Sequence, residues 1–219
     1  MKISENTLSI LKNFATINPS LSVKAGNVLS TISPQKTIFA KATIDDSFPK
    51  DFAVYEVSKF LGAMSLFGDP EIEFFDDHMK ISENKKAIRY VYTDPTMVIS
   101  PPNKEVSLPS VDIVFNLTSD DLNKVQRALS VLKVPEMSIV GEDGTIYVKA
   151  MNNKSSSSDS FSIAVGVTEK AFNMIFKAEN LKLMNNDYEV SLSSKGISQF
   201  KSNSIVYWVA TEAQSKYEE

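Results

Sequence analysis

Apolar residues near the start of the chain recur at the spacing of an amphipathic α-helix. The residues of this apolar face are Leu8, Leu11, Phe14 and Ala15. Lys12 falls on the opposite face, Ser4 can cap the first turn, and Asn18, which precedes a proline, ends the pattern. The pattern predicts a helix with one buried stripe and a polar face that holds a cation.

Short segments with strand patterns follow this helix, and turn residues separate them. The predicted strands are residues 21–24, 28–32 and 37–44. A second helix is predicted over residues 55–67, since apolar residues again recur with helical spacing until a Gly-Asp-Pro sequence at residues 68–70. Residues 71–75, 79–82 and 87–92 alternate with polar turns and predict an antiparallel meander.

The second half of the chain repeats this order of elements. Residues 118–133 form another amphipathic pattern, which Thr118 can cap and which ends before Pro135. Its apolar stripe consists of Leu122, Val125, Leu129 and Leu132. Two alternating segments flank an Asp143-Gly144 pair that is typical of a hairpin. The remaining predicted elements are a strand at residues 161–167, a helix around residues 178–184, and strands at residues 188–192, 197–201 and 205–210.

Helix, hairpin, strands, short helix and three-strand meander thus occur twice, with a period of roughly 110 residues. Between the copies, residues 94–110 contain several prolines, which disfavour helix and predict an extended connector. Repetition of a whole element order indicates two similar domains. We therefore predict an α+β fold of helices and antiparallel sheet, with domains at residues 1–108, including most of the connector, and 109–219.

The composition is that of a globular protein, with 42% hydrophobic and 23% charged residues. The absence of cysteine excludes disulfides and cysteine-ligated metal sites. No apolar run reaches the roughly 18 residues of a membrane span, and the first residues lack the apolar segment of a signal peptide. We expect a soluble, intracellular protein with no membrane partner.

No arrangement of residues typical of a catalytic or cofactor site is present in the sequence. The single histidine, His78, falls in a predicted polar turn, and no glycine-rich phosphate-binding motif occurs. Acidic pairs at residues 45–46, 76–77 and 120–121 fall in turns or at a helix start, where local roles explain them. The sequence predicts a protein that is not an enzyme and uses no metal or cofactor.

Positive charges on the predicted helices are more informative than the net charge of −4. Lys124 and Arg127 lie roughly opposite the apolar stripe of their helix. Lys12 is placed in the same way on the first helix, and Lys59 lies off the stripe of the second. An ordinary solvated helix face explains this placement, and so does weak contact with phosphates. Arg89 and Arg127 are the two arginines of the chain, too few to favour the reading of bases.

Family-specific runs of residues occur in the first half of the chain and in the connector. They are Leu11-Lys12-Asn13-Phe14-Ala15-Thr16-Ile17-Asn18, Phe60-Leu61-Gly62 with Leu66, Asp94-Pro95-Thr96-Met97-Val98, and Pro102-Asn103-Lys104. Through these runs the chain resembles the sliding clamps, or DNA polymerase processivity factors, of T-even-type bacteriophages. The second half matches in pattern, and the chain departs from the family mainly in a serine-rich segment at residues 154–160 and in residues 216–219.

The resemblance implies the DNA clamp fold and a homotrimeric ring, with sheets outside and helices lining a central hole. Such a ring encircles duplex DNA without sequence specificity and tethers the replicative phage DNA polymerase, which confers processivity. Further implied partners are an ATP-driven clamp loader and late-transcription factors that act with host RNA polymerase. The implied location is the cytoplasm of the infected bacterial host cell.

The resemblance also implies two sets of functional residues. Those expected to face the DNA channel are Lys2, Lys12, Lys59, Lys124, Arg127, Lys133 and Lys182. Those expected to line a pocket for partner peptides near the connector are Val98, Ile99, Pro101, Pro102, Val106, Leu108, Val209 and Ala210. Packing of the connector on its own domain is the alternative role of the pocket residues.

Two other classes of function stay open. One is a structural or adaptor protein that uses the same double-domain, β-rich fold without binding DNA. The other is an enzyme whose site is assembled across subunits. Cations opposite apolar stripes favour the clamp over the first, and the lack of catalytic motifs disfavours the second.

Overall fold

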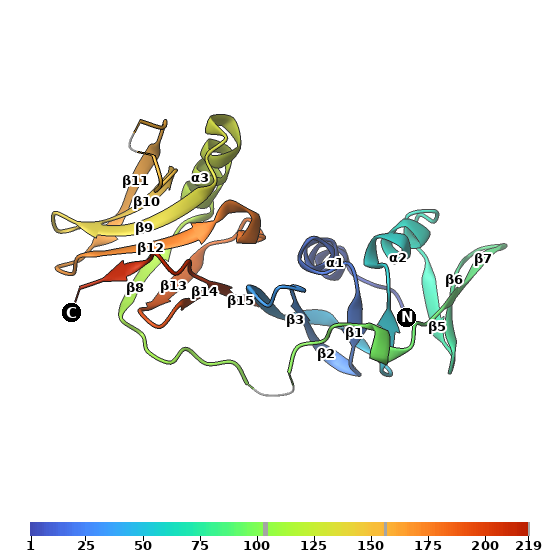
Figure 1. The fold of residues 1–219 in the computed structure, drawn as a ribbon. Coiled ribbons are helices and arrows are strands. Elements are labelled where there is room, and N and C mark those ends of the chain that lie inside the picture. Colours follow the sequence, from blue (N-terminus) through green and yellow to red (C-terminus); the bar gives the residue numbers. More distant parts are fainter. Residues whose placement is uncertain (103–104, 156, 219) are drawn as a thin grey trace. The chain divides into compact units, whose positions relative to one another are not determined.

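A computed structural model describes residues 1–102, 105–155 and 157–218 of the chain. The chain forms two compact units, Met1–Lys104 and Glu105–Glu219, each built from helices and antiparallel strands (Figure 1). The sequence places the division at residue 108, within the same connector. Residues 103–104 of the connector, residue 156 of the serine-rich segment and residue 219 lie outside the described residues.

Unit 1 starts with a helix and has a second, shorter helix between its strands. The helices are α1 (Glu5–Ile17) and α2 (Val57–Met64). The strands are β1 (Leu21–Val23), β2 (Gly26–Ile32), β3 (Ile38–Phe48), β4 (Phe52–Val54), β5 (Glu71–Phe74), β6 (His78–Glu83) and β7 (Lys86–Val91). Strand β1 pairs with β4, β2 pairs with β3, and β5, β6 and β7 form the predicted antiparallel meander.

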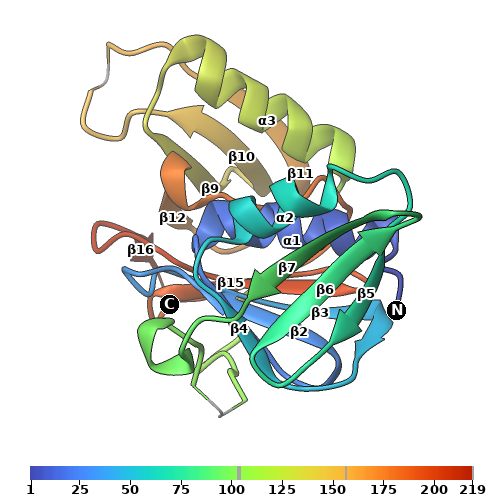
Figure 2. The ribbon, with the colours of Figure 1, turned by 90° about the vertical axis from the view of Figure 1, so that its right-hand side faces the viewer.

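Helix α1 is held to unit 1 by its apolar stripe. Ile10, Leu11 and Phe14 are almost fully buried, and the helix packs against α2, β2 and β3. Figure 2 shows α1 and α2 side by side. Burial of an apolar side chain of this size contributes about 1.5–3 kcal/mol. The stripe therefore determines which face of α1 points to solvent.

Unit 2 contains helix α3 (Ser119–Leu132) and a larger set of antiparallel strands. The strands are β8 (Ile113–Leu117), β9 (Glu136–Glu142), β10 (Thr145–Met151), β11 (Phe161–Val167), β12 (Phe172–Lys177), β13 (Tyr188–Ser193), β14 (Ile197–Lys201), β15 (Ile205–Ala210) and β16 (Lys216–Tyr217). One sheet has the order β11-β10-β9-β12-β16, and β8, β13, β14 and β15 pair in that order. Helix α3 packs against β9, β10 and β11.

The order of elements confirms two similar domains of helices and antiparallel sheet. The series α1, β1–β4, α2, β5–β7 in unit 1 corresponds to α3, β9–β12, a 3-10 turn and β13–β15 in unit 2. The predicted hairpin is confirmed as well. Asp143 and Gly144 have φ angles of 50° and 77°, and positive angles at both residues are typical of a two-residue hairpin turn.

Two predicted local structures are wrong. Residues 178–184 are not an α-helix, because a 3-10 turn at Ala178–Asn180 is followed by Leu181 and Leu183, which alternate into the core as in an extended segment. The connector is not wholly extended, because Asp94 caps a 3-10 turn at Pro95–Met97. Helix α2 is also shorter than predicted, and the sequence prediction omits β4, β8, β12 and β16.

Gly141 on β9 lies where a side chain has no space. A Cβ atom there would overlap the carbonyl oxygen of Lys170 and the ring of Phe172 on the neighbouring strand. We predict that Gly141→Ala lowers the free energy of unfolding by about 1–3 kcal/mol, the usual cost of overpacking. Chemical denaturation measures this change.

Gly62 provides the matched control, because a Cβ atom at this position inside α2 would meet no atom within 4 Å. Gly62→Ala is expected to raise the free energy of unfolding by about 0.5–1 kcal/mol, since alanine is the better helix former. Equal stability of the wild-type and Gly141→Ala proteins would contradict the predicted overlap.

Candidate nucleic-acid interface

Hydrogen bonds within residues 4–7, and between Ser4 and a residue of β3, determine where α1 starts. The Ser4 side chain accepts a hydrogen bond from the Thr7 amide and is therefore the N-cap. Asp46 on β3 accepts hydrogen bonds from the Ser4 amide (2.9 Å) and from the Ser4 hydroxyl (2.8 Å). These bonds attach the N-terminal end of α1 to β3, and they help to fix which side of the helix faces solvent.

Lys12 lies on the exposed face of α1. It lines a groove of about 360 Å³ between α1 and α2, together with Leu8, Leu61 and Asp69. Within the described residues Lys12 has no ion-pair partner. Its ammonium group is therefore available to an external anion.

Helix α3 presents a second cationic face. Its apolar stripe, which includes Leu122, is buried, while Lys124 and Arg127 are exposed. Lys124 Nζ is 2.6 Å from Asp120, one helical turn earlier, and this hydrogen bond raises the pKa of Lys124. Arg127 has no ion pair in the part of the chain that the structure describes. The unpaired charge on this face is therefore the guanidinium of Arg127.

The other predicted channel cations are placed less uniformly. Lys2 precedes α1 and pairs with Asp69, and Lys59 is exposed on α2. Lys133 ends α3 in the left-handed conformation, with φ of 52°. Lys182 is half-buried in an extended segment, so its assignment to an inner helix is wrong. The reason is that its two neighbours, Leu181 and Leu183, are both buried in the core, which an extended chain allows and an α-helix does not.

The residues predicted to bind partner peptides differ in exposure. Ile99 and Pro102 are exposed, and the half-buried members are Pro101, Val106, Leu108 and Ala210. Val98 is 8% exposed, and Val209 on β15 is fully buried. Val209 belongs to the core of unit 2 and cannot contact a peptide on the surface of this chain, so this prediction is wrong.

The connector is attached to the end of α1. Asn18, the C-cap of this helix, donates side-chain hydrogen bonds to the carbonyl oxygens of Ile32 (2.9 Å) and Ile99 (3.1 Å). The same residue that ends the helix therefore also positions the connector beside β2.

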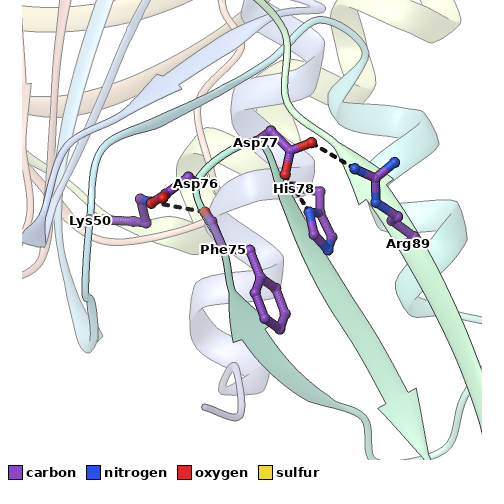
Figure 3. A network of polar contacts seen from close by, with 6 residues as sticks. All are labelled: Lys50, Phe75, Asp76, Asp77, His78 and Arg89. Carbon is purple, nitrogen blue, oxygen red and sulfur yellow. Dashed lines mark hydrogen bonds and ion pairs between the residues drawn. The ribbon is translucent and has the colours of Figure 1, made fainter.

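His78 is the first residue of β6 and lies in a polar network on the β5–β6–β7 meander (Figure 3). Its Nδ1 is 2.6 Å from Asp77 Oδ1, and Arg89 on β7 donates to Asp77 Oδ2 at 2.6 Å. The imidazole stacks on Phe75, with ring centroids 4.6 Å apart. The hydrogen bond with His78, and the charge of Arg89, hold the pKa of Asp77 below its usual value. These contacts pin the β5–β6 turn to β7.

Each residue of the acidic pairs noted in the sequence has a partner within the chain, although Asp45 and Asp46 lie in β3 and not in a turn as predicted. Their hydrogen bonds join Asp45 to Asn6, Asp46 to Ser4, Asp76 to Lys50, Asp77 to Arg89, Asp120 to Lys124 and Asp121 to Thr118. Among the described residues no group of three or more His, Cys, Asp or Glu side chains could hold a metal ion. No helix among them is long and apolar enough to cross a membrane.

Two residues that shape this surface were noted in the sequence only as members of acidic pairs, without the roles that the structure gives them. Asp120 neutralises Lys124, and its four-residue spacing from the lysine is a signal for such a pair. Asp46 positions α1 although 42 positions separate it from Ser4. No local pattern could reveal that contact.

Similarity to solved structures shows that the fold is that of the DNA clamps. The chain matches the A. fulgidus PCNA, solved with the C-terminal region of FEN-1, with a TM-score of 0.72. The match covers 99% of this chain and 100% of that chain at 12% sequence identity. At this identity the likeness shows the fold alone.

The sequence comparisons define the family. A model described as DNA polymerase processivity factor matches residues 3–92, and one described as gp45 sliding clamp, C terminal, matches residues 114–213. The chain is 33% identical to the sliding clamp of Vibrio phage KVP40, over 97% of this chain and 100% of that protein. It is 31% identical to the sliding clamp of Enterobacteria phage T4 over 100% of both chains. The chain belongs to the phage sliding-clamp family.

The carboxylate of Asp46 makes the attachment of α1 depend on pH. Burial raises the pKa of Asp46, but hydrogen bonds from Thr7 and Ser4 outweigh burial and lower it. A group whose pKa is lowered by folding stabilises the protein above its unfolded-state pKa, and that contribution disappears as the pH falls through the folded-state pKa. We predict that Asp46→Asn lowers the melting temperature at pH 7, and that the difference from wild type shrinks below about pH 4.

Thermal unfolding followed by circular dichroism at neutral and acidic pH measures this difference. Asp45→Asn is the matched control, because Asp45 accepts its hydrogen bond from the exposed side chain of Asn6 in the first turn of α1 (3.1 Å) and not from the N-cap residue Ser4. An equally large destabilisation by Asp46→Asn at both pH values would mean that the charge of Asp46 is not responsible.

Proposed function

We propose that this chain is a clamp that encircles duplex DNA without sequence preference and tethers the replicative phage DNA polymerase, which becomes processive. Membership of the sliding-clamp family supports this function. The structural observation that supports it most directly is a repeated one. The corresponding helices of the two units, α1 and α3, expose Lys12 and Arg127 opposite their buried stripes. A ring of copies would present this cation pair to DNA several times.

The mechanism is topological. A closed ring cannot leave DNA sideways, so retention does not require strong contacts. Strong phosphate contacts would slow sliding, whereas isolated cations give a weak attraction that salt screens. Lysine suits this role because its ammonium is a point charge that can exchange one phosphate for the next. In this role the chain catalyses no reaction, and an ATP-driven clamp loader places it on DNA.

The proposed channel cations differ in how freely they can meet phosphate. Lys12, Lys59 and Arg127 have no ion pair within the described residues. Lys2 and Lys124 are already paired with carboxylates. A phosphate must compete with these carboxylates, so the paired lysines are expected to contribute less to DNA affinity. Lys133, at the end of α3, is also expected to contribute less to DNA affinity than the unpaired cations in the middle of the helices.

Two strand edges support closure into a homotrimeric ring. Strand β7 ends the meander of unit 1, and β11 ends a sheet of unit 2. No other strand among the described residues pairs with the outer side of either one. Each edge exposes an apolar side chain, Val91 (55%) and Val167 (86%). The β7 edge has a basic residue, Lys86, at its start, whereas acidic residues, Asp159 and Glu169, flank the β11 edge. The two edges thus have charges of opposite sign. We propose that β7 of one copy pairs with β11 of the next, so that the contacts repeat head to tail.

Partner proteins are proposed to dock on the connector. Val98 is largely buried in unit 1. The residues still available for this role are Ile99, Pro101 and Pro102 in unit 1 and Val106, Leu108 and Ala210 in unit 2. The A. fulgidus clamp solved with the C-terminal region of FEN-1 supports docking of a short protein segment on this fold. We propose that the polymerase, the loader and late-transcription factors acting with host RNA polymerase use this surface in the cytoplasm of the infected bacterial cell.

Primer extension on a circular template, with the cognate polymerase and loader, tests the function. The wild-type chain is expected to lengthen the products of single polymerase binding events. In the same assay Lys12→Ala/Arg127→Ala is expected to load less efficiently at moderate salt, because every copy in the ring loses two cations that can contact phosphate. The slope of log affinity against log salt should fall by about 1 for each lost contact.

Lys41→Ala/Lys201→Ala is the matched control, since both lysines are exposed on strands rather than on helices. Products of unchanged length on addition of the wild-type chain would contradict the clamp function. If both double variants lost DNA affinity equally, the assignment of the channel to α1 and α3 would be wrong.

A separate prediction concerns ring closure. Val91→Asp and Val167→Asp are each expected to weaken association of the subunits by about 100-fold or more, because each buries a carboxylate at the pairing edge. Sedimentation equilibrium at micromolar concentration measures the mass. Val131→Asp is the matched control, because Val131 is an equally apolar and exposed residue (76%) that lies on helix α3 and not on an edge strand. A monomeric wild-type chain would contradict the ring, and trimeric edge variants would contradict the β7–β11 pairing.

A further inference from the structure

The outer edge of β12 is covered by residues 212–218 of the same chain, referred to below as the strap. At one end the Glu212 amide donates to the Ile175 carbonyl (2.8 Å), and Glu212 pairs with Lys177 (3.6 Å). In the middle the Ile175 amide donates to Ser215 Oγ (2.9 Å). A serine hydroxyl therefore occupies the place that a carbonyl oxygen of a neighbouring strand would take.

At the other end the strap becomes a true strand. Strand β16 pairs antiparallel with Phe172 and Asn173 of β12. Beyond it the Glu218 amide donates to the carbonyl of Ala171 (3.0 Å). The strap thus accompanies β12 from its last residue to the residue before its first.

Lys170 fastens this end of the strap. Its ammonium lies 2.6 Å from the Tyr217 hydroxyl and 5.4 Å from the centre of the Tyr217 ring. The same ammonium donates to the carbonyl of Asp112 (3.3 Å). One lysine thus joins the strap to the turn before β12 and to the segment before β8.

The strap is a narrow cover. Strand β16 has two residues, and Ala213 and Gln214 are exposed. Without the strap, β12 would offer unpaired backbone amides and carbonyls along its edge, as β11 does at the other end of the same sheet. Such edges pair readily with strands of other chains.

We infer that the outer edge of β12 is a second strand-pairing surface for another copy of this chain, and that the strap keeps it closed. The inference rests on the proposed pairing between β7 and β11. With both ends of the sheet open, β7 of another copy could pair at either end. Head-to-tail contacts at the wrong end do not close into the same ring and lead to open assemblies. The strap therefore restricts the association of copies to β11.

The test compares the full chain with a chain that stops after Thr211. Light scattering after size-exclusion chromatography is expected to show the shortened chain in species larger than the wild-type assembly, growing with concentration. Hydrogen exchange of the Ile175 amide at low concentration should be about tenfold faster, as expected for loss of one hydrogen bond. Gln214→Ala, an exposed change within the strap, is the control and should behave as wild type.

A shortened chain with faster exchange at Ile175 and an unchanged mass would overturn the inference. If the shortened chain lost its folded circular dichroism spectrum, the variant Ser215→Ala/Tyr217→Ala would replace it in both measurements, with the same expected and contradicting results. This variant removes the side-chain contacts and keeps the backbone of the strap. A monomeric wild-type chain would refute the ring. In that case, new association on removal of the strap would still support the closed edge.

Discussion

The burial of one stripe of α1 and one stripe of α3 against their sheets determines the rest of the arrangement. Because α1 buries Leu11 and Phe14, Lys12 on the opposite side of the helix must face solvent. In the same way the burial of Leu122 on α3 makes Arg127, on the opposite side, face solvent. The hydrophobic effect supplies the orientation, and the cations need no contacts of their own to keep their direction. This separation suits weak binding of DNA, since the charges remain solvated and replaceable while their placement stays rigid.

The net charge of the chain is a poor guide to this function. Its value of −4 argues against a protein coated with cations, and three copies would have −12, which is three times −4. In the proposed ring an acidic exterior would repel the duplex from every surface except the helices, so a negative net charge is compatible with DNA inside it. Pairs such as Asp120 with Lys124 reduce the attraction further at the helices themselves. The proposed clamp therefore holds DNA with a few unpaired cations, and topology supplies the retention.

Elements with a strong local pattern could be predicted from the sequence. The caps and stripes of α1 and α3 and the Asp143-Gly144 turn are of this kind. Strand β12 was missed because its residues are buried at four of six positions without regular alternation. Strand β16 was missed because two residues hold no pattern. In the site, exposure of Lys12 and Arg127 follows from periodicity. The burial of Val209 and the anchoring role of Asp46 depend on partners distant in sequence.

The edges of the sheets impose the last constraint on a ring of this type. A β-rich subunit that associates through strands must leave some edges open, and every open edge is also a place for wrong pairing. In unit 2 the two ends of one sheet are treated differently: β11 is uncovered, while seven residues and one lysine are committed to β12. Such a commitment has no part in the hydrophobic core or in the cationic helix face. The covering of β12 has a function if ring closure depends on how many strand edges are open for pairing, and not only on how tightly each edge pairs.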